Sequence, residues 1–193
     1  MKRLLDIICS LLALVVFSPL WIVIALAIVL ESRGGVLYRQ ERVGRNNRDF
    51  MLYKFRTMRT GSDKKGLLTV GNRDSRVTRV GYFPRKYKLD EFPQLVNIIK
   101  GDMSIVGPRP HMVAQTQMYS ELIDKYMLRH TIKPGITGWA QVRGYRGQTE
   151  ELWQMEKRVE FDVWYAENWS FFLDLKIIFR TIWNALTGED NAY

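Results

Sequence analysis

The sequence predicts a mainly helical α+β protein with one small β-hairpin and an N-terminal membrane segment. Three observations lead to this fold class. The chain begins with a long apolar run, two short β-prone segments flank a polar turn, and several later segments repeat apolar residues at helical spacing. A chain of 193 residues fits one domain with its own core. We therefore expect residues 1–193 to form a single domain, with residues 1–32 in the membrane and residues 33–193 outside it.

The charge of the chain requires an anionic partner. The net charge is +9, and the isoelectric point is near 9.7. Such a balance suits nucleic acid, an acidic membrane surface or a phosphorylated substrate, and charge alone does not choose among them. Cys9 is the only cysteine, which excludes a disulfide framework. The two histidines, His111 and His130, supply no zinc-ligand spacing.

The membrane segment covers residues 4–30. As one helix it would measure about 40 Å, enough to cross a bilayer. The run is too long for a cleaved signal peptide, and no cleavage site follows it. Ser18-Pro19 interrupts it, since proline removes a backbone donor and bends a helix. Either a kinked spanning helix or a re-entrant helix could result, and the residues alone favour the spanning form. Cations on both flanks place the rest of the chain in the cytoplasm.

The remaining segments predict a hairpin, a loop and four helices. The β-prone runs 36–38 and 50–53 flank a polar turn at 44–47, which predicts the hairpin, and a long loop covers residues 57–81. The helices are expected at 90–99, ending at Gly101, and at 113–128, 150–166 and 171–186. The last is amphipathic. It suits a position at the membrane interface and, equally, packing on the protein's own core.

Asp90 and Glu91 form the most informative local feature. Asp90 is a strong helix N-cap, and Pro93 is tolerated within a first helical turn. Adjacent carboxylates can hold a divalent cation such as Mg²⁺, and an ionised aspartate can attack phosphorus to give an acyl-phosphate. Acidic residues in a first helical turn also serve simply as caps, so this pair alone does not establish chemistry.

Three further blocks carry residues that could bind anions. In the run from Gly101 to Pro110, two prolines rigidly mount Arg109, as phosphate or nucleobase recognition requires. The run from Tyr53 to Met58 alternates aromatic or apolar residues with the cations Lys54 and Arg56. The fourth block spans residues 133–142. Taken singly, each block also fits an ordinary turn or a solvated strand face.

Together these blocks resemble the bacterial sugar transferase family, the monotopic phosphoglycosyl transferases. The resemblance covers nearly the whole chain in the family's order. It rests on Ser18-Pro19, Tyr53 to Met58, Leu89-Asp90-Glu91 with Pro93-Gln94-Leu95, Gly101 to Pro110, Pro134 to Val142, Phe161-Asp162, Tyr165, Asn168-Trp169-Ser170 and Leu173 to Lys176. The run from Gly101 to Pro110 is the most specific of these.

The resemblance implies a ping-pong reaction on a UDP-sugar. The carboxylate of Asp90 attacks the phosphate next to the sugar, releases UMP, and passes the phosphosugar to undecaprenyl phosphate. Glu91, together with Asp90, holds Mg²⁺. Candidates for phosphate and uridine contacts are Lys54, Arg85, Arg109, Pro108 and Pro110, and the matching blocks add Arg56 and Gln141. Such a reaction starts the assembly of an exopolysaccharide, a capsule, an O-antigen or another glycoconjugate.

The resemblance also reverses the preference for a spanning helix. It implies a monotopic protein whose re-entrant segment turns at Ser18-Pro19, with the catalytic part on the cytoplasmic side of the bacterial inner membrane. Membrane lipid is then a partner, nucleic acid is not, and a homodimer is compatible. The alternative is a non-catalytic basic protein that binds anionic lipid or RNA at the membrane surface. The sequence does not decide between a minimal protein and a catalytic fragment.

Two features of the sequence bear on details of the site. Tyr87-Lys88 replaces the small hydroxyl pair that is common in the family, and Phe83-Pro84 replaces an apolar pair, which puts the placement of Arg85 in doubt. The segments 144–149 and 155–160 are similar to members that transfer glucose-1-phosphate or galactose-1-phosphate. We therefore expect UDP-glucose as the donor, with UDP-galactose next.

Overall fold

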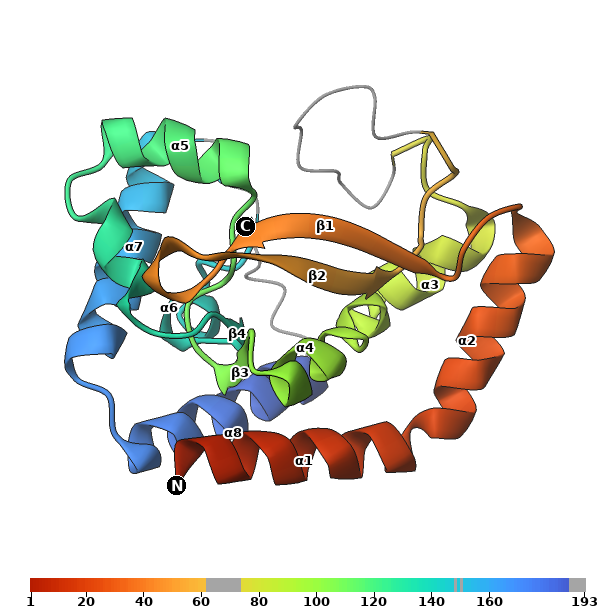
Figure 1. Ribbon diagram of the computed structural model, residues 1–193, viewed down its shortest axis with the longest axis horizontal. Coiled ribbons are helices and arrows are strands. Elements are labelled where there is room, and N and C mark those ends of the chain that lie inside the picture. Colours follow the sequence, from red (N-terminus) through yellow and green to blue (C-terminus); the bar gives the residue numbers. More distant parts are fainter. Residues whose placement is uncertain (62–73, 148, 150, 188–193) are drawn as a thin grey trace.

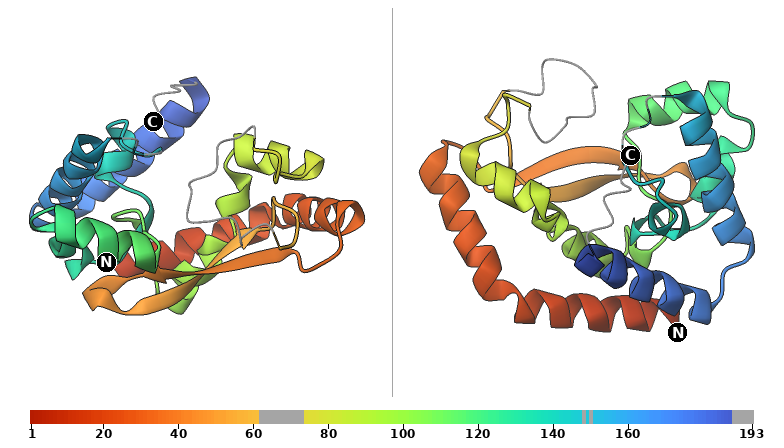
Figure 2. Two further views of the ribbon diagram at one scale, coloured as in Figure 1. Left: turned by 90° about the horizontal axis from the view of Figure 1, so that it is seen from above. Right: turned by 180° about the vertical axis from the view of Figure 1, so that it is seen from behind.

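The computed structural model describes residues 1–61, 74–147, 149 and 151–187. Within them the chain is mainly helical with two small sheets, which confirms the predicted α+β class. The helices are α1 (Lys2–Val16), α2 (Ser18–Glu31), α3 (Arg79–Lys86), α4 (Gln94–Lys100), α5 (Val113–Leu122), α6 (Trp139–Val142), α7 (Leu152–Glu167) and α8 (Phe171–Thr187). The strands are β1 (Leu37–Val43), β2 (Asp49–Phe55), β3 (Ser104–Val106) and β4 (Gly135–Thr137). Figure 1 shows α5 and α7 at one end of the molecule, α3 at the other, and the β1–β2 hairpin between them; Figure 2 shows the same arrangement.

Helices α1 and α2 meet at a bend of 63° that falls at Ser18-Pro19, where the sequence predicts a break. Pro19 cannot donate to the carbonyl of Val15, and the Ser18 hydroxyl donates to that carbonyl instead (2.8 Å). No single helix in the described residues is long and apolar enough to cross a membrane. Taken together, the two helices of the bent pair have the length and apolar composition of a broken membrane span or a re-entrant loop.

The first turns of α1 are fixed to the rest of the protein by polar bonds. Asp6 is 2% exposed, and it accepts hydrogen bonds from the Ser104 hydroxyl (2.9 Å) and from the backbone amide that follows (2.9 Å). Lys2 pairs with Asp174 on α8 (2.6 Å). Arg3 donates to two carbonyl groups at the end of α4. Because each partner is buried or partly buried, these bonds set where α1 can lie.

The β1–β2 hairpin matches the predicted one. Its strands pair antiparallel from Leu37↔Phe55 to Val43↔Asp49. The turn places Asn46 and Asn47 at φ 55° and 58°, a left-handed conformation that asparagine tolerates better than most residues. Phe55, at the end of β2, packs against Ile24 and Ile28 of α2. The hairpin therefore joins the apolar face of α2 to the middle of the molecule.

Helix α3 occupies the end of the segment predicted as a loop. The part of that loop at residues 62–73 lies outside the described residues, but α3 begins at Arg79, so the prediction is wrong for its last residues. Thr78 caps the helix by accepting from the Gly81 amide (2.9 Å). Glu31, at the end of α2, accepts from the amides of Arg79 and Val80 (2.7 and 2.8 Å). The Thr78 cap is local, whereas the bond from Arg79 to Glu31 spans 48 residues and leaves no local signal.

Asp90 does not begin a regular helix. Leu89–Glu91 form a 3₁₀ turn, and α4 starts only at Gln94, four residues later than predicted. No side chain caps the turn, so the simple helix-cap role weighed for Asp90 is wrong. Lys88 precedes the turn at φ 58°. The predicted end of the helix is confirmed, because Gly101 takes the left-handed conformation at φ 98°.

Strands β3 and β4 form a parallel pair that the sequence did not predict. Ser104 pairs with Gly135 and Val106 with Thr137. A Cβ atom on Gly135 would lie 2.1 Å from the Gly107 nitrogen, so only glycine allows this approach. The pairing brings the run from Gly101 to Pro110 beside the block at residues 133–142. Two segments that looked separate in the sequence therefore leave the same edge of one sheet.

The helix predicted at 113–128 ends early. Helix α5 stops at Leu122, Ile123 turns extended, and a 3₁₀ segment follows at Tyr126–Thr131. The reason is tertiary, since Ile123 and Tyr126 are buried against Met155 and Val159 of α7. Helices α7 and α8 lie at the predicted positions, although residue 150 is outside the described residues.

Candidate active site

Glu91 is the meeting point of three cations from three separate segments. Its Oε1 accepts from Lys54 Nζ (2.9 Å) and Arg109 Nη2 (2.7 Å), and its Oε2 lies 3.4 Å from Arg146 Nη2. Lys54 comes from β2, Arg109 from the Pro-Arg-Pro turn after β3, and Arg146 from the segment between α6 and α7. The side chain of Glu91 is 9% exposed, so this network lies largely out of water.

The charge of Glu91 is stabilised by its partners. Burial alone would raise the pKa of Glu91, but the charges of Arg109 and Lys54 hold it well below its usual range. Glu91 in turn raises the pKa of Arg109 against the opposing effect of burial. Both groups are therefore ionised near neutral pH, and they form a buried ion pair with excess positive charge around it.

Asp90, although adjacent, has a different environment. It is half-buried, and within the described residues its carboxylate accepts no hydrogen bond. Burial raises the pKa of Asp90, while the charge of Lys54 opposes the shift and Glu91 adds to it. Arg85 and Arg109 also act on Asp90 through their charges. A carboxylate without bonded partners, close to several cations, suits attack on an electrophilic phosphorus.

The Pro-Arg-Pro turn is held through all three of its carbonyl groups. The Gly135 amide donates to the Pro108 carbonyl (2.9 Å), Arg129 to the Arg109 carbonyl (2.8 Å), and Arg42 to the Pro110 carbonyl (3.1 Å). These donors come from β4, from the 3₁₀ segment after α5, and from β1. Because prolines restrict the backbone on both sides, the Arg109 side chain extends towards Glu91 from a fixed base.

The chain is similar to known proteins over almost its whole length. The family described as bacterial sugar transferase matches residues 1–188. A UDP-glucose:undecaprenyl-phosphate glucose-1-phosphate transferase of Escherichia coli (strain K12) is 47% identical over 189 residues, which cover 98% of this chain and 41% of that protein. The protein of the same name from Caulobacter vibrioides is 46% identical over 192 residues, covering 100% of this chain and 72% of that protein.

The chain belongs to the bacterial sugar transferase family. A third relative, a UDP-N-acetylgalactosamine-undecaprenyl-phosphate N-acetylgalactosaminephosphotransferase of Aeromonas hydrophila, is 44% identical over 188 residues, covering 97% of this chain and 44% of that protein. The chain spans about two fifths of the length of several of the relatives it matches.

This sugar transferase brings together most of the predicted site residues. Lys54, Arg109 and the carboxylate pair are in contact or electrostatically close, and the charge of Arg85, in the last turn of α3, acts on Asp90. Arg56 differs, because its guanidinium donates to the carbonyls of Ser32 and Arg33 at the end of α2 (2.7 Å each). Its role as a substrate contact stays a prediction, and in this structure it fixes the backbone that follows α2.

Gln141 is buried without partners. It lies on α6, directly after the parallel strand pair, and is 7% exposed. Within the described residues both its amide nitrogen and its carbonyl oxygen lack a hydrogen-bond partner. A buried amide normally has at least one, so a bound water or ligand group would satisfy it. Contact with substrate stays a prediction for this residue.

The Tyr87-Lys88 pair is accommodated at the surface. Both residues are exposed, and the Tyr87 ring packs on Phe83 with ring centres 4.8 Å apart. The departure from the family pattern therefore leaves Arg85 near the carboxylates, where its charge acts on Asp90.

Two cations at the site were missed by sequence reasoning. Arg146 lies in a segment that the sequence linked only to sugar choice, and no sequence pattern singled out Arg42. Burial lowers the pKa of both guanidinium groups, that of Arg42 to about 10. No local pattern identifies either residue, because their roles depend on contacts with Glu91 and with the Pro110 carbonyl.

The donor set fits Mg²⁺ only in part. No group of three or more His, Cys, Asp or Glu residues forms a metal site in the described part of the chain. The oxygens of Glu91 already face Lys54, Arg109 and Arg146, whereas those of Asp90 accept no hydrogen bond there. Mg²⁺ commonly binds one or two carboxylates and takes its other ligands from water and substrate phosphates. The pair fits that mode. Asp90 would be the accessible ligand, and Glu91 would bind the ion only after one of its three cations had moved away.

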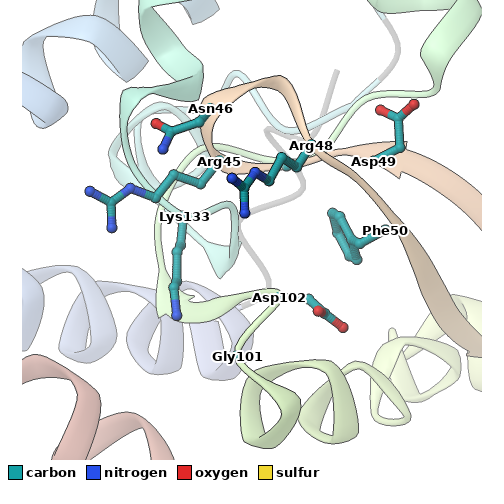
Figure 3. Close-up of a pocket in the computed structure, with 9 residues that line it drawn as sticks. Arg45, Asn46, Arg48, Asp49, Phe50, Gly101, Asp102 and Lys133 are labelled. Atoms are coloured by element: carbon teal, nitrogen blue, oxygen red, sulfur yellow. The ribbon is translucent and has the colours of Figure 1, made fainter.

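A cavity of about 440 Å³ lies at the other end of the hairpin and contains no predicted site residue. Its lining residues are Gly44, Arg45, Asn46, Arg48, Asp49, Phe50, Gly101, Asp102 and Lys133. In Figure 3 the guanidinium groups of Arg45 and Arg48 extend from the hairpin turn, and Asp102 lies on the opposite side. The cavity mixes three cations with two carboxylates, but in the described residues neither carboxylate contacts three cations as Glu91 does.

Proposed function

We propose that the chain transfers a sugar-1-phosphate from a UDP-sugar to undecaprenyl phosphate, releasing UMP, through a covalent phosphosugar on Asp90. The observation that carries this proposal is the contrast within the carboxylate pair. Glu91 holds three cations in place, and Asp90 has an oxygen free of hydrogen bonds beside them. A diphosphate entering this site would meet Arg109, Lys54 and Arg146 and present its phosphorus to Asp90.

In the first half-reaction a carboxylate oxygen of Asp90 attacks the phosphorus that carries the sugar. The bond from this phosphorus to the bridging oxygen breaks, and UMP leaves with that oxygen. Arg109 and Arg146 neutralise the charge that develops on the departing phosphate. In the second half-reaction an oxygen of undecaprenyl phosphate attacks the same phosphorus, and Asp90 leaves as a carboxylate. Mg²⁺ bound by Asp90 and Glu91 would shield the negative charge of the two diphosphate groups.

The relatives bear on the choice of sugar. Two of them are named for glucose-1-phosphate and one for N-acetylgalactosamine phosphate, at similar identity to this chain. We infer that UDP-glucose is the donor, with UDP-galactose next. The similar identity of the third relative means that overall similarity does not determine the sugar, so a panel of UDP-sugars is the appropriate test.

We further infer that α1 and α2 form a re-entrant segment and that α8 lies at the membrane surface. Large apolar side chains are exposed on all three helices, among them Leu12 (62%), Val23 (63%) and Phe179 (66%). In water such a surface would be costly, whereas lipid would cover it. The catalytic part would then face the cytoplasm, where a soluble nucleotide sugar and a lipid phosphate at headgroup level both reach Asp90.

The test of activity is UMP release from a panel of UDP-sugars with undecaprenyl phosphate and Mg²⁺. We expect release with UDP-glucose. No release with any donor would contradict the proposal and would favour a non-catalytic basic protein of the membrane surface. Incubation with labelled UDP-sugar and no acceptor should leave phosphosugar on the protein, whereas direct transfer between the substrates would leave none.

The test of topology is cysteine labelling in intact cells. Cys9 is first replaced by serine, and a cysteine is placed at residue 2. A re-entrant segment keeps this residue in the cytoplasm, so an impermeant external reagent should not label it. Labelling from outside would establish a spanning helix instead.

A further inference from the structure

Two buried arginines lie behind the two arginines that contact Glu91. Arg129 is 1% exposed and Arg158 is 6% exposed. Arg129 lies in the 3₁₀ segment after α5, and Arg158 lies on α7. Removing a guanidinium group from water is costly unless its donors are satisfied. The acceptors that satisfy these two groups therefore indicate what the groups do.

Arg129 bonds to the backbone of Arg109. Its Nη2 donates to the Arg109 carbonyl (2.8 Å) and to Asp162 (2.6 Å), and its Nε also donates to Asp162 (3.0 Å). The carbonyl belongs to the residue whose side chain contacts Glu91. Arg129 thus fixes the point from which the Arg109 side chain begins.

Arg158 does the same for Arg146. Its Nε donates to the Tyr145 carbonyl (2.9 Å) and its Nη2 to the Gly147 carbonyl (2.6 Å), so it holds the backbone on both sides of Arg146. The described residues of this segment form no regular helix or strand. The bonds from Arg158 give it a fixed position relative to α7.

His111 and Asp162 connect the two arginines. His111 Nδ1 lies 2.9 Å from Arg129 Nη1, and its Nε2 lies 3.5 Å from Arg158 Nη1. Burial, with the charges of Arg129 and Arg158, lowers the pKa of His111 well below its usual value, so the ring is neutral. Asp162 lies one helical turn after Arg158 on α7 and supplies negative charge to both arginines.

We propose that Arg129 and Arg158 are positioning residues that hold the backbones of Arg109 and Arg146, so that both guanidinium groups meet the diphosphate of the nucleotide donor. The proposal rests on the proposed function. Because Arg158 lies on α7, this helix becomes part of the donor site. Within the described residues, no group of α7 touches Glu91 itself. Recognition of the UDP-sugar donor therefore depends on Arg129 and Arg158, whereas recognition of undecaprenyl phosphate does not.

The experiment compares Arg129→Lys and Arg158→Lys in the full chain. Lysine keeps the positive charge but cannot bond to two acceptors in a fixed geometry. We expect kcat/KM for the UDP-sugar to fall on the order of 100-fold, the cost of displacing a binding group by about 1 Å. The KM for undecaprenyl phosphate should not change. Lys157→Gln is the matched control, since Lys157 lies beside Arg158 on α7 but is exposed, and it should behave as the wild type.

Binding of UDP, measured by calorimetry, gives a readout that needs no turnover. We expect both lysine variants to bind UDP more weakly than the wild type, and Asp162→Asn to weaken binding in the same direction. Unchanged UDP affinity in well-folded variants would overturn the proposal, as would equal losses for donor and acceptor. A wild type that binds UDP but releases no UMP would instead contradict the proposed function, so the two failures are distinguishable.

Discussion

The two ends of the β1–β2 hairpin are both basic but differ in how their charges are arranged. At the turn, Arg45 and Arg48 are exposed and line a cavity together with Asp49 and Asp102. At the other end, Lys54 joins Arg109 and Arg146 on one buried carboxylate, with Asp90 adjacent. The comparison teaches that neither positive charge nor cavity volume identifies the site. The feature that distinguishes the candidate site is a buried carboxylate in contact with three cations.

The largest effect is expected from Asp90→Asn. The amide cannot form the phosphosugar intermediate, so UMP release should fall on the order of 10⁴-fold, as for loss of a nucleophile. The measurement is single-turnover UMP release together with trapping of the adduct. Asp49→Asn, at the turn, is the matched control and should leave both unchanged. Normal turnover by the Asp90 variant would exclude this residue as the nucleophile.

Glu91→Gln should have the next largest effect. It leaves Lys54, Arg109 and Arg146 without their common counter-ion, and breaking a buried pair costs about 3 kcal/mol. We expect a lower thermal midpoint and about 100-fold weaker catalysis, because the cations are no longer held in position. Added UDP should restore much of the lost stability, since its phosphates replace the missing carboxylate. If UDP stabilises the variant less than the wild type, the cations do not form the diphosphate site.

A matched pair of substitutions tests the two ends directly. Lys54→Met removes one of three cations on Glu91, and we expect kcat/KM for the UDP-sugar to fall about tenfold, the typical effect of one charged hydrogen bond. Arg48→Met removes an exposed cation at the turn, where surface substitutions change stability by less than about 0.5 kcal/mol and should leave activity intact. Similar losses in both variants would show that the basic surface acts as a whole rather than through Glu91.

The smallest effect is a displaced pH profile. A free aspartate has a pKa of about 3.9, and burial raises that of Asp90, so the nucleophile is protonated at a pH where an ordinary aspartate is still ionised. Adduct formation should therefore fall on acidification at a pH above 3.9, about tenfold per unit. The pKa of Glu91 is lowered, so the stability that its ion pairs contribute is present above about pH 4.3 and is lost only as pH falls through its folded value. A rate profile that breaks at the ordinary aspartate value would contradict the environment assigned to Asp90.

The sequence predicted the parts of the fold that depend on local pattern. The hairpin, the break at Ser18-Pro19, the helix end at Gly101, and helices α7 and α8 all follow from turn residues, proline, glycine or periodicity. The parts it missed depend on distant contacts. The first amides of α3 bond to Glu31, α5 ends where Ile123 packs on α7, and β3 pairs with β4 across a separation of 31 residues.

The residues of the candidate site divide in the same way, into those that a sequence pattern identifies and those that only distant contacts identify. The sequence singled out Asp90, Glu91, Lys54, Arg85 and Arg109 through the family pattern, and the structure brings them together. It could not single out Arg146, Arg129 or Arg158. Their function depends on which backbone carbonyls or carboxylates they reach, and a sequence of 29 cations does not show which few are buried.

The polar bonds of α1 have a consequence for the order in which the chain is made. Asp6 leaves the ribosome 98 residues before Ser104, its hydrogen-bond partner, and Lys2 leaves 172 residues before Asp174. At synthesis rates of roughly 5–20 residues per second, Asp6 must wait about 5–20 seconds without its native partner. A carboxylate beside an apolar run is costly in lipid for as long as it stays unpaired. In the re-entrant arrangement proposed above, the helix pair would therefore reach its final depth only after Ser104 and Asp174 have been synthesised, so insertion and folding would be completed together.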